Sequence, residues 1–207
     1  MPTVIQRITF TASSSFTSDP NVFNAALQIL KKAPGFIGSF HGLQIDDGKT
    51  GYFITVWSSP EHFSSFAQPT SFPAYTQFLD TLKPYAVNGK LETHHVYTPD
   101  TIDPHTALRA PITELVLFKF KPGVTLAQIG PLYDELGVGL DRAKGSHPPC
   151  FWAVSKESNE DEVLVFVGWD TVEEHWDAVK EGTELHAVIQ KLLEKSSFVL
   201  GHAKLME

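Results

Sequence analysis

Gly51-Tyr-Phe-Ile-Thr-Val-Trp57 runs into Ser58-Ser-Pro-Glu-His-Phe63, and the same pattern returns as Val163-Leu-Val-Phe-Val-Gly-Trp169 followed by Asp170-Thr-Val-Glu-Glu-His-Trp176. Each copy is an apolar strand that ends in tryptophan, then a short polar cap, then a histidine beside an aromatic residue. The two tryptophans are 112 positions apart, and the two histidines are 113 positions apart. A shared order at a nearly constant offset predicts an internal repeat.

A further match and a break in the middle of the chain support the repeat. Phe72-Pro-Ala-Tyr-Thr-Gln-Phe-Leu79 parallels Leu185-His-Ala-Val-Ile-Gln-Lys-Leu192. Residues 98–111 contain three prolines and no sustained period. Because proline fixes φ and removes a backbone donor, we expect this segment to be an extended linker. It separates a first repeat, residues 1–97, from a second repeat, residues 112–207.

Both halves predict the same order of elements. Runs of β-branched and aromatic residues predict strands, and apolar residues at helical spacing predict helices. In the first half we expect strands at 4–10, 36–45, 51–57 and 90–97, and helices at 21–30 (capped by Ser18 or Asp19) and at 60–82, broken near Pro69. In the second half we expect strands at 112–121, 149–155, 162–169 and 198–205, and helices at 126–137, 172–181 and 183–195. The order β-α-β-β-α-β is that of a ferredoxin-like split βαβ unit.

Apolar side chains alternate on both faces of the expected strands. Phe118 and Phe120 share one face, whereas Leu115 and Leu117 share the other. Both faces of each sheet therefore require burial. The economical solution is an α+β fold in which two ferredoxin-like repeats form one eight-stranded α/β barrel within one chain. The helices would lie outside and a lumen would lie between the sheets, and a homodimer of such barrels stays open.

The composition excludes several classes of protein. The chain has 207 residues, a formal charge of −8, 42% apolar residues and one cysteine. Cys150 alone cannot form an intramolecular disulfide, and it is expected to pack as a small apolar residue. The acidic balance argues against nucleic acid and anionic membranes, and no apolar run approaches the roughly 20 residues that span a bilayer. We expect a soluble, cytoplasmic protein whose partner is a small molecule.

Three segments of the second half resemble a known family. They are Thr113-Glu-Leu-Val-Leu-Phe-Lys-Phe-Lys-Pro-Gly-Val-Thr125, the segment from Trp169 to Trp176, and the region of His186. The chain resembles a tandem-fused pair of stress-responsive A/B-barrel domains. That family belongs to the dimeric α/β-barrel superfamily, together with antibiotic-biosynthesis monooxygenases, EthD-like proteins, chlorite dismutases and dye-decolourising peroxidases.

The resemblance implies where a site would lie. A plant polyketide cyclase of the family has two pocket histidines, one on the first strand and one on the loop before the last helix. Strand matching places Glu114 at the first position, with Gln6 as its counterpart in the first half. The second position falls on or near His186. Some plant hydroxynitrile lyases share the barrel and use no cofactor, so the resemblance implies proton-transfer chemistry.

Glu114 and His186 are the catalytic candidates. Period-2 alternation puts Glu114, Val116 and Phe118 on one face of a strand. If that face lines the lumen, desolvation raises the pKa of the carboxyl group toward values useful for a general base. Imidazole can transfer protons near neutral pH, which suits His186. The alternatives are an exposed or salt-bridged glutamate and a histidine on the surface of a helix.

Other residues receive supporting roles. The residues expected to contact substrate are Gln6, His41, Tyr52, Val116 and Phe118. His62 and His175 occupy equivalent positions, and their repetition predicts a structural role outside the barrel. His95 and His202 could both face the lumen, but no spacing typical of metal ligands occurs. We therefore expect no metal and no cofactor, and haem enters only as an alternative from the superfamily.

The sequence leaves three hypotheses for the function. The leading one is a cofactor-independent cyclase, isomerase or lyase that acts by acid–base chemistry on a small, largely apolar molecule, aromatic or polyketide-like. The second is a barrel that binds a small molecule or serves a stress response without catalysis. The third is a monooxygenase of the antibiotic-biosynthesis type or a barrel that binds haem or a metal.

Overall fold

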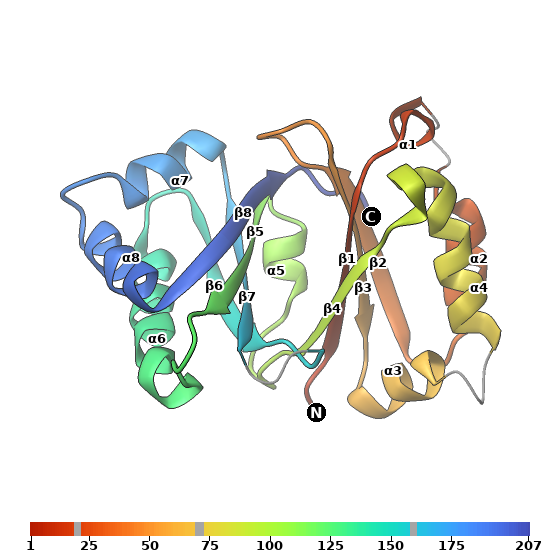
Figure 1. Cartoon of the computed structure of the whole chain (residues 1–207), viewed down its shortest axis with the longest axis horizontal. Helices are drawn as coiled ribbons and strands as arrows, with labels where there is room; N and C mark the ends of the chain where they lie inside the picture. Colours follow the sequence, from red (N-terminus) through yellow and green to blue (C-terminus); the bar gives the residue numbers. More distant parts are fainter. Residues whose placement is uncertain (19–21, 69–72, 158–160) are drawn as a thin grey trace. The chain divides into compact units, whose positions relative to one another are not determined.

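The computed structural model describes residues 1–18, 22–68, 73–157 and 161–207. It divides into two compact units, Met1–Asp100 together with Glu207, and Thr101–Met206. Each unit contains one four-stranded antiparallel sheet with helices packed on a face of it (Figure 1). The fold is therefore mixed α+β.

The first unit follows the expected order of elements. Its sheet has the strand order β2-β3-β1-β4. The elements are β1 (Val4–Thr11), α1 (Ser14–Ser18), α2 (Asn24–Leu30), β2 (Phe36–Leu43), β3 (Thr50–Trp57), α3 (Pro60–Ala67), α4 (Pro73–Leu82), two 3₁₀ turns at Lys83–Tyr85 and Val87–Gly89, and β4 (Glu92–Tyr97). Its core lies between the sheet and the helices and is rich in phenylalanine.

The second unit has the equivalent sheet order, β6-β7-β5-β8. Its elements are α5 (His105–Leu108), β5 (Ile112–Phe120), α6 (Leu126–Arg142), β6 (Ser146–Val154), β7 (Glu162–Trp169), α7 (Val172–Val179), α8 (Glu184–Lys195) and β8 (Ser196–Ala203). Helices α6, α7 and α8 cover one face of this sheet, as Figure 1 shows. The two sheets therefore have the same order of strands at equivalent positions of the two units.

Threonine side chains fix where the helices of the second unit begin. Thr125 forms a capping box with Gln128 at the start of α6. The hydroxyl of Thr171 accepts a hydrogen bond from the backbone N–H of Glu174 at α7, and the hydroxyl of Thr183 does the same for α8. Each cap satisfies a backbone donor that a helix would otherwise leave without a partner.

Alternation along β5 decides which side chains face the helices. Val116, Phe118 and Phe120 belong to the core that packs against α6 and α8. The ring of Phe118 meets the ring of Tyr133 on α6 edge to face, with 5.2 Å between ring centroids. Thr113 lies an odd number of positions from these three residues along β5, so its side chain points to the other face of the sheet. There its hydroxyl donates to the carbonyl of Ala107 in α5. The short helix therefore lies on the opposite face of the sheet.

Three expectations from the sequence are corrected. Residues 98–111 are not extended throughout, because α5 forms within them and packs against β6 and β7 of the second unit. The strands of the described residues form two separate sheets, not one closed eight-stranded barrel, because hydrogen bonding ends at the edge strands of each sheet. Ser18, one of the two expected caps of the first helix, instead ends α1, and α2 begins at Asn24 after Phe23. The other expected cap, Asp19, and the expected break near Pro69 fall outside the described residues.

Leu192 tests the helix-facing core of the second unit. It is fully buried on α8. Leu192→Ala should lower the free energy of unfolding by about 2–5 kcal/mol, because it removes buried methyl groups and leaves a cavity. Val138→Ala, on the exposed side of α6, should change it by less than about 0.5 kcal/mol. Urea unfolding followed by circular dichroism measures both, and equal effects would contradict this assignment of the core.

Candidate functional site

The strand register of the second unit brings polar residues together on the helix-facing side. Strand β5 lies between β7 and β8, where Glu114 is paired with Val167 on one side and with His202 on the other. Paired residues in neighbouring strands point to the same face. Glu114 and His202 therefore both point toward the helices, where α7 supplies a third group, His175.

These side chains form a connected chain, which we call the Glu114–His175–His202 cluster. The indole Nε1 of Trp169, at the end of β7, donates a hydrogen bond of 2.7 Å to Glu114 Oε2. The other carboxylate oxygen, Oε1, lies 3.5 Å from Nε2 of His175. Nδ1 of His175 lies 2.8 Å from Nε2 of His202, which is hydrogen-bond distance. The middle imidazole thus connects the carboxylate to the second imidazole.

The cluster is nearly inaccessible to solvent. The exposed fractions of the three residues are 5%, 2% and 0% for Glu114, His175 and His202. An ionised carboxylate in such surroundings is costly unless hydrogen bonds or an opposite charge compensate it. The indole of Trp169 donates to one carboxylate oxygen, and the ring of His175 lies beside the other.

An apolar cavity of about 250 Å³ adjoins this cluster. Its walls come from β5, β7 and β8 on one side and from α6, α7 and α8 on the other. The lining residues are Glu114, Val116, Phe118, Leu136, Leu140, Val165, His175, Trp176, Val179, His186, Ile189, Gln190, Leu193, Phe198 and Leu200. A few polar groups in an otherwise apolar wall are typical of a small-molecule site.

Two aromatic residues of this wall are also exposed to solvent. The exposed fraction is 50% for Trp176 on α7 and 39% for Phe198 on β8. The ring of Phe198 also contacts that of Phe118 inside the cavity, with 5.5 Å between centroids. Large exposed apolar side chains at the edge of a pocket favour contact with a flat apolar molecule.

The matching positions of the first unit make different contacts. Gln6, paired with His95 as Glu114 is with His202, donates from Nε2 to the hydroxyl of Tyr75 at 2.8 Å. The indole of Trp57 donates to Thr55 instead of to a carboxylate. His62 Nδ1 lies 2.8 Å from the hydroxyl of Ser58, beside the start of α3. The two units thus share their backbone order but not this cluster.

Some predicted site residues are brought together and others are not. Glu114, Val116, Phe118 and His186 all line the cavity of the second unit, but this cavity lies between sheet and helices, not in a lumen between two sheets. Gln6, His41 and Tyr52 belong to the first unit. There the ring of His41 packs on Phe23, burial lowers the pKa of His41, and the hydroxyl of Tyr52 donates to Gln44.

The sequence did not predict two members of the cluster, His175 and His202, or the Trp169 indole that donates to it. His175 was expected to have a structural role because His62 occupies the equivalent position; in the structure His175 lies beside Glu114 and His202, whereas His62 lies beside Ser58. His202 was compared only with His95, and Trp169 served only to mark the repeat. The pairing of Glu114 with His202 could have been found from the sequence by aligning the two strands β5 and β8 as antiparallel neighbours.

The described residues that line the cavity do not fit haem, the cofactor named in the third hypothesis drawn from the sequence. No lysine or arginine is among its described lining residues to pair with the propionates. His186 lies 3.2 Å through Nδ1 from the carbonyl of Val179 and 3.3 Å through Nε2 from Gln190. Both ring nitrogens of His175 lie beside other members of the cluster. Among the described lining residues we therefore find no histidine nitrogen placed to act as the proximal ligand of haem iron.

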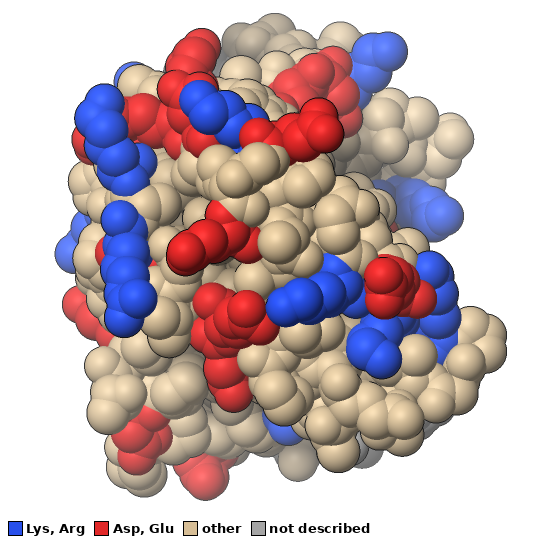
Figure 2. All heavy atoms as spheres, turned by 90° about the vertical axis from the view of Figure 1, so that its left-hand side faces the viewer, with Lys and Arg blue, Asp and Glu red and all other residues tan. Residues whose placement is uncertain are grey.

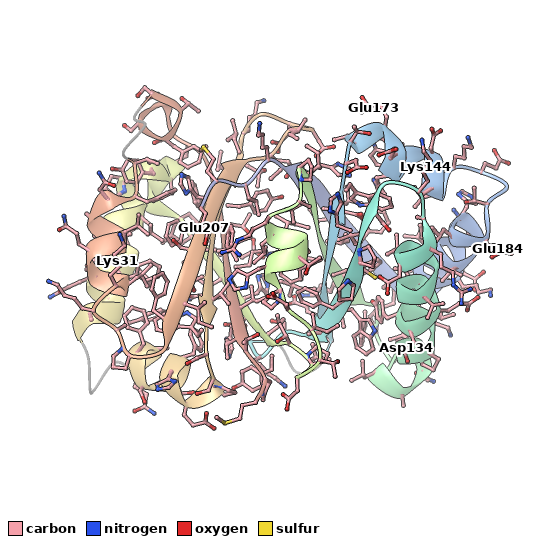
Figure 3. The ribbon with its side chains drawn as sticks, turned by 180° about the vertical axis from the view of Figure 1, so that it is seen from behind. Lys31, Asp134, Lys144, Glu173, Glu184 and Glu207 are labelled. Carbon is pink, nitrogen blue, oxygen red and sulfur yellow. The ribbon has the colours of Figure 1, made fainter. Side chains whose placement is uncertain are left out.

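The outer face of the second unit carries mixed charge. Figure 2 shows acidic and basic side chains interspersed over its helices. Asp134, Lys144, Glu173 and Glu184 lie at this outer surface, away from the sheet (Figure 3). This face thus lacks the single-sign field that favours nucleic acid. Among the described helices, none has the length and apolar character needed to cross a membrane.

Comparison with known proteins gives structural likeness only. Neither a protein-family model nor a curated protein matches the chain. A structure described as a putative monooxygenase from Fusobacterium nucleatum has 11% identity and a TM-score of 0.68, over 100% of this chain and 93% of that one. An anthrone oxidase-like protein has 13% identity and a TM-score of 0.63, over 100% and 92%. Chlorite dismutase from Candidatus Nitrospira defluvii has 11% identity and a TM-score of 0.58, over 97% and 90%.

At these identities the likeness shows the fold and nothing of the activity. The matched proteins have the ferredoxin-like α/β-barrel fold of the dimeric α/β-barrel superfamily. The finer resemblance to a tandem stress-responsive pair stays a prediction, and so do the roles of individual site residues.

Cys150 is a buried thiol near the site but not in it. Its sulfur donates to the carbonyl of Gly137, and burial raises the pKa of the thiol, with a further rise from the carboxylate of Asp141. Because the thiolate is the reactive form, folded protein at pH 8 should react with iodoacetamide far more slowly than protein unfolded in urea. Mass spectrometry measures the labelling. Rapid stoichiometric labelling of the folded protein would contradict this environment.

Proposed function

We propose that the second unit is an enzyme that removes a proton from a small, largely apolar molecule bound in its cavity, without a cofactor. One observation carries the proposal. The buried carboxylate of Glu114 borders an apolar cavity and is held by Trp169 and His175. A carboxylate that is removed from water and lies within reach of a bound molecule is a stronger general base than one in water.

Glu114 is the base in this proposal. Its Oε2 is held by the indole of Trp169, which fixes the plane of the carboxylate. Oε1 is the oxygen nearer to His175 and is the one that would accept the proton. A base held by its neighbours loses little entropy when the proton transfers, which is how preorganised groups lower a barrier.

The two histidines would position and supply protons. If Nε2 of His202 carries a proton, it donates to Nδ1 of His175, whose own Nε2–H then points at the carboxylate of Glu114. The tautomer of one imidazole would thus be set by the hydrogen bond of the other. His186, on the helical side of the cavity, is the candidate for returning a proton to the product.

Two reaction types begin with removal of a proton from the substrate. In a cyclase, isomerase or lyase, the carbanion left on the substrate rearranges or expels a group. In a cofactor-free monooxygenase, the carbanion would give electrons to O2, so that a CH2 group becomes C=O and the second oxygen atom leaves as water. The second type is favoured by fold neighbours described as a putative monooxygenase and as anthrone oxidase-like.

A binding protein without catalysis is the rival function. The apolar cavity and its exposed aromatic edge, Trp176 and Phe198, would serve it equally well. The buried cluster decides between the two, because binding an apolar molecule does not require a carboxylate and two imidazoles beside it.

Anthrone is a suitable probe of the base, because its methylene is acidic and its rings are flat and apolar. The protein should accelerate exchange of the methylene hydrogens with D2O under nitrogen, measured by proton NMR. Glu114→Gln should lower that acceleration by about 10²–10⁴-fold, because the amide cannot accept the proton. Glu135→Gln, the same change at an exposed ion pair with Lys191, should leave it unaltered. Exchange at the buffer rate, or equal rates in wild type and Glu114→Gln, would contradict the proposal.

Ile189 offers a test of where the molecule binds. It lies half-buried on α8 and lines the cavity. Ile189→Trp should weaken anthrone binding at least about tenfold, a loss of about 1.4 kcal/mol, because the larger side chain fills the space. Val138→Trp, on the same outer layer of helices but not on this cavity, is the control. Calorimetry gives both affinities, and unchanged binding in Ile189→Trp would place the ligand elsewhere.

A further inference from the structure

We propose that the Glu114–His175–His202 cluster also binds one divalent transition-metal ion. Each of the three residues offers one ligand atom, and these atoms lie within 4.8 Å of one another. Two imidazoles and one carboxylate suit Zn²⁺, Co²⁺, Ni²⁺ and Fe²⁺. Mg²⁺ and Ca²⁺ prefer all-oxygen ligands and are not expected here.

Part of the required geometry is already in place. Around a tetrahedral ion, with bonds of about 2.0–2.1 Å, two ligand atoms lie about 3.3 Å apart. The separation of Glu114 Oε1 and His175 Nε2 is 3.5 Å, close to that value. The carboxylate and this imidazole could therefore hold an ion between them with little movement.

The second imidazole must turn. His202 Nε2 lies 2.8 Å from Nδ1 of His175, which is a hydrogen-bond distance and involves the nitrogen on the far side of the ring from Glu114. Metal binding therefore breaks this hydrogen bond and swings His202 toward Nε2 of His175. Because the nitrogens must lose their protons to bind the ion, binding releases protons and weakens as the pH falls.

The surroundings match those of metal sites in proteins. Trp169 donates to Glu114 Oε2 and so holds the carboxylate with Oε1 turned to His175, in the manner of an outer-shell hydrogen bond. Glu114 and His175 also border the cavity. A fourth coordination position would therefore open toward the cavity, where a water molecule or a ligand could take it.

The first unit lacks this donor set at the matching positions. Gln6 offers no carboxylate and is hydrogen-bonded to Tyr75, and His62 lies beside Ser58 and Ser59. We therefore expect one such ion per chain. The ion would occupy the oxygen that the proposed function uses as a base, so the loaded protein should not catalyse proton exchange and a chelator should restore it.

Cobalt titration tests the site without relying on turnover. Protein first treated with a chelator and desalted should bind one Co²⁺ per chain, seen as visible d–d absorption that saturates, with release of protons into weak buffer. Glu114→Gln and His202→Asn should each weaken binding at least about tenfold. His62→Asn, the equivalent helix position of the first unit, is the matched control and should bind as the wild type does. Circular dichroism verifies that each variant is folded.

A measurement on the wild-type protein covers the case in which a variant fails to fold. Each coordinated imidazole keeps one ring N–H, so the Co²⁺-loaded protein should show two exchangeable, paramagnetically shifted proton resonances. Binding in the wild type that is absent or not saturable at one ion per chain would overturn the proposal. So would unaltered binding in folded Glu114→Gln and His202→Asn, or loaded protein with no shifted imidazole resonance. None of these results bears on whether metal-free protein catalyses exchange, so the two proposals can fail separately.

Discussion

The carboxylate of Glu114 is buried in an apolar layer between a sheet and its helices, and the rest of the site follows from that constraint. A carboxylate so placed needs polar partners; two elements bring them next to it, and a third brings a group that contacts one of those partners. The end of β7 brings the Trp169 indole, α7 brings His175, and β8 places His202 behind it. The threonine caps of α7 and α8 fix where those helices begin, and so fix the positions of His175 on α7 and His186 on α8.

The same backbone order can exist without this site. In the first unit, an amide, Gln6, takes the place of the carboxylate, and a tyrosine hydroxyl from α4 satisfies it. Aromatic rings then fill the layer: Phe66, Tyr75 and Phe78 contact one another there. One unit thus uses its helix–sheet layer for packing, whereas the other keeps a cavity of about 250 Å³ beside ionisable groups. The same order of strands and helices therefore occurs in this chain both with and without the Glu114–His175–His202 cluster.

Much of the fold could be predicted from the sequence, because strand and helix periods are local. The element order was expected in both halves, and so was the face shared by Glu114, Val116 and Phe118. The location of the cavity could not be predicted, since apolar residues on both faces of β5 do not say which face receives the helices. His175 and His202 were missed because their role depends on strand register and on a helix contact, and both are tertiary. Residues 98–111 were expected to be extended, but α5 packs on the sheet despite the prolines.

Nitrogen NMR of the imidazole rings tests whether Glu114, His175 and His202 form one connected chain. Long-range ¹⁵N–¹H correlation of metal-free protein reports which ring nitrogen carries the proton in each histidine. We expect Nδ1 of His175 to accept from a proton on Nε2 of His202. Glu114→Gln should alter the ring signals of both histidines, whereas Glu135→Gln should alter neither. Signals of His202 that are unchanged in Glu114→Gln, with each ring titrating independently of the other, would contradict it.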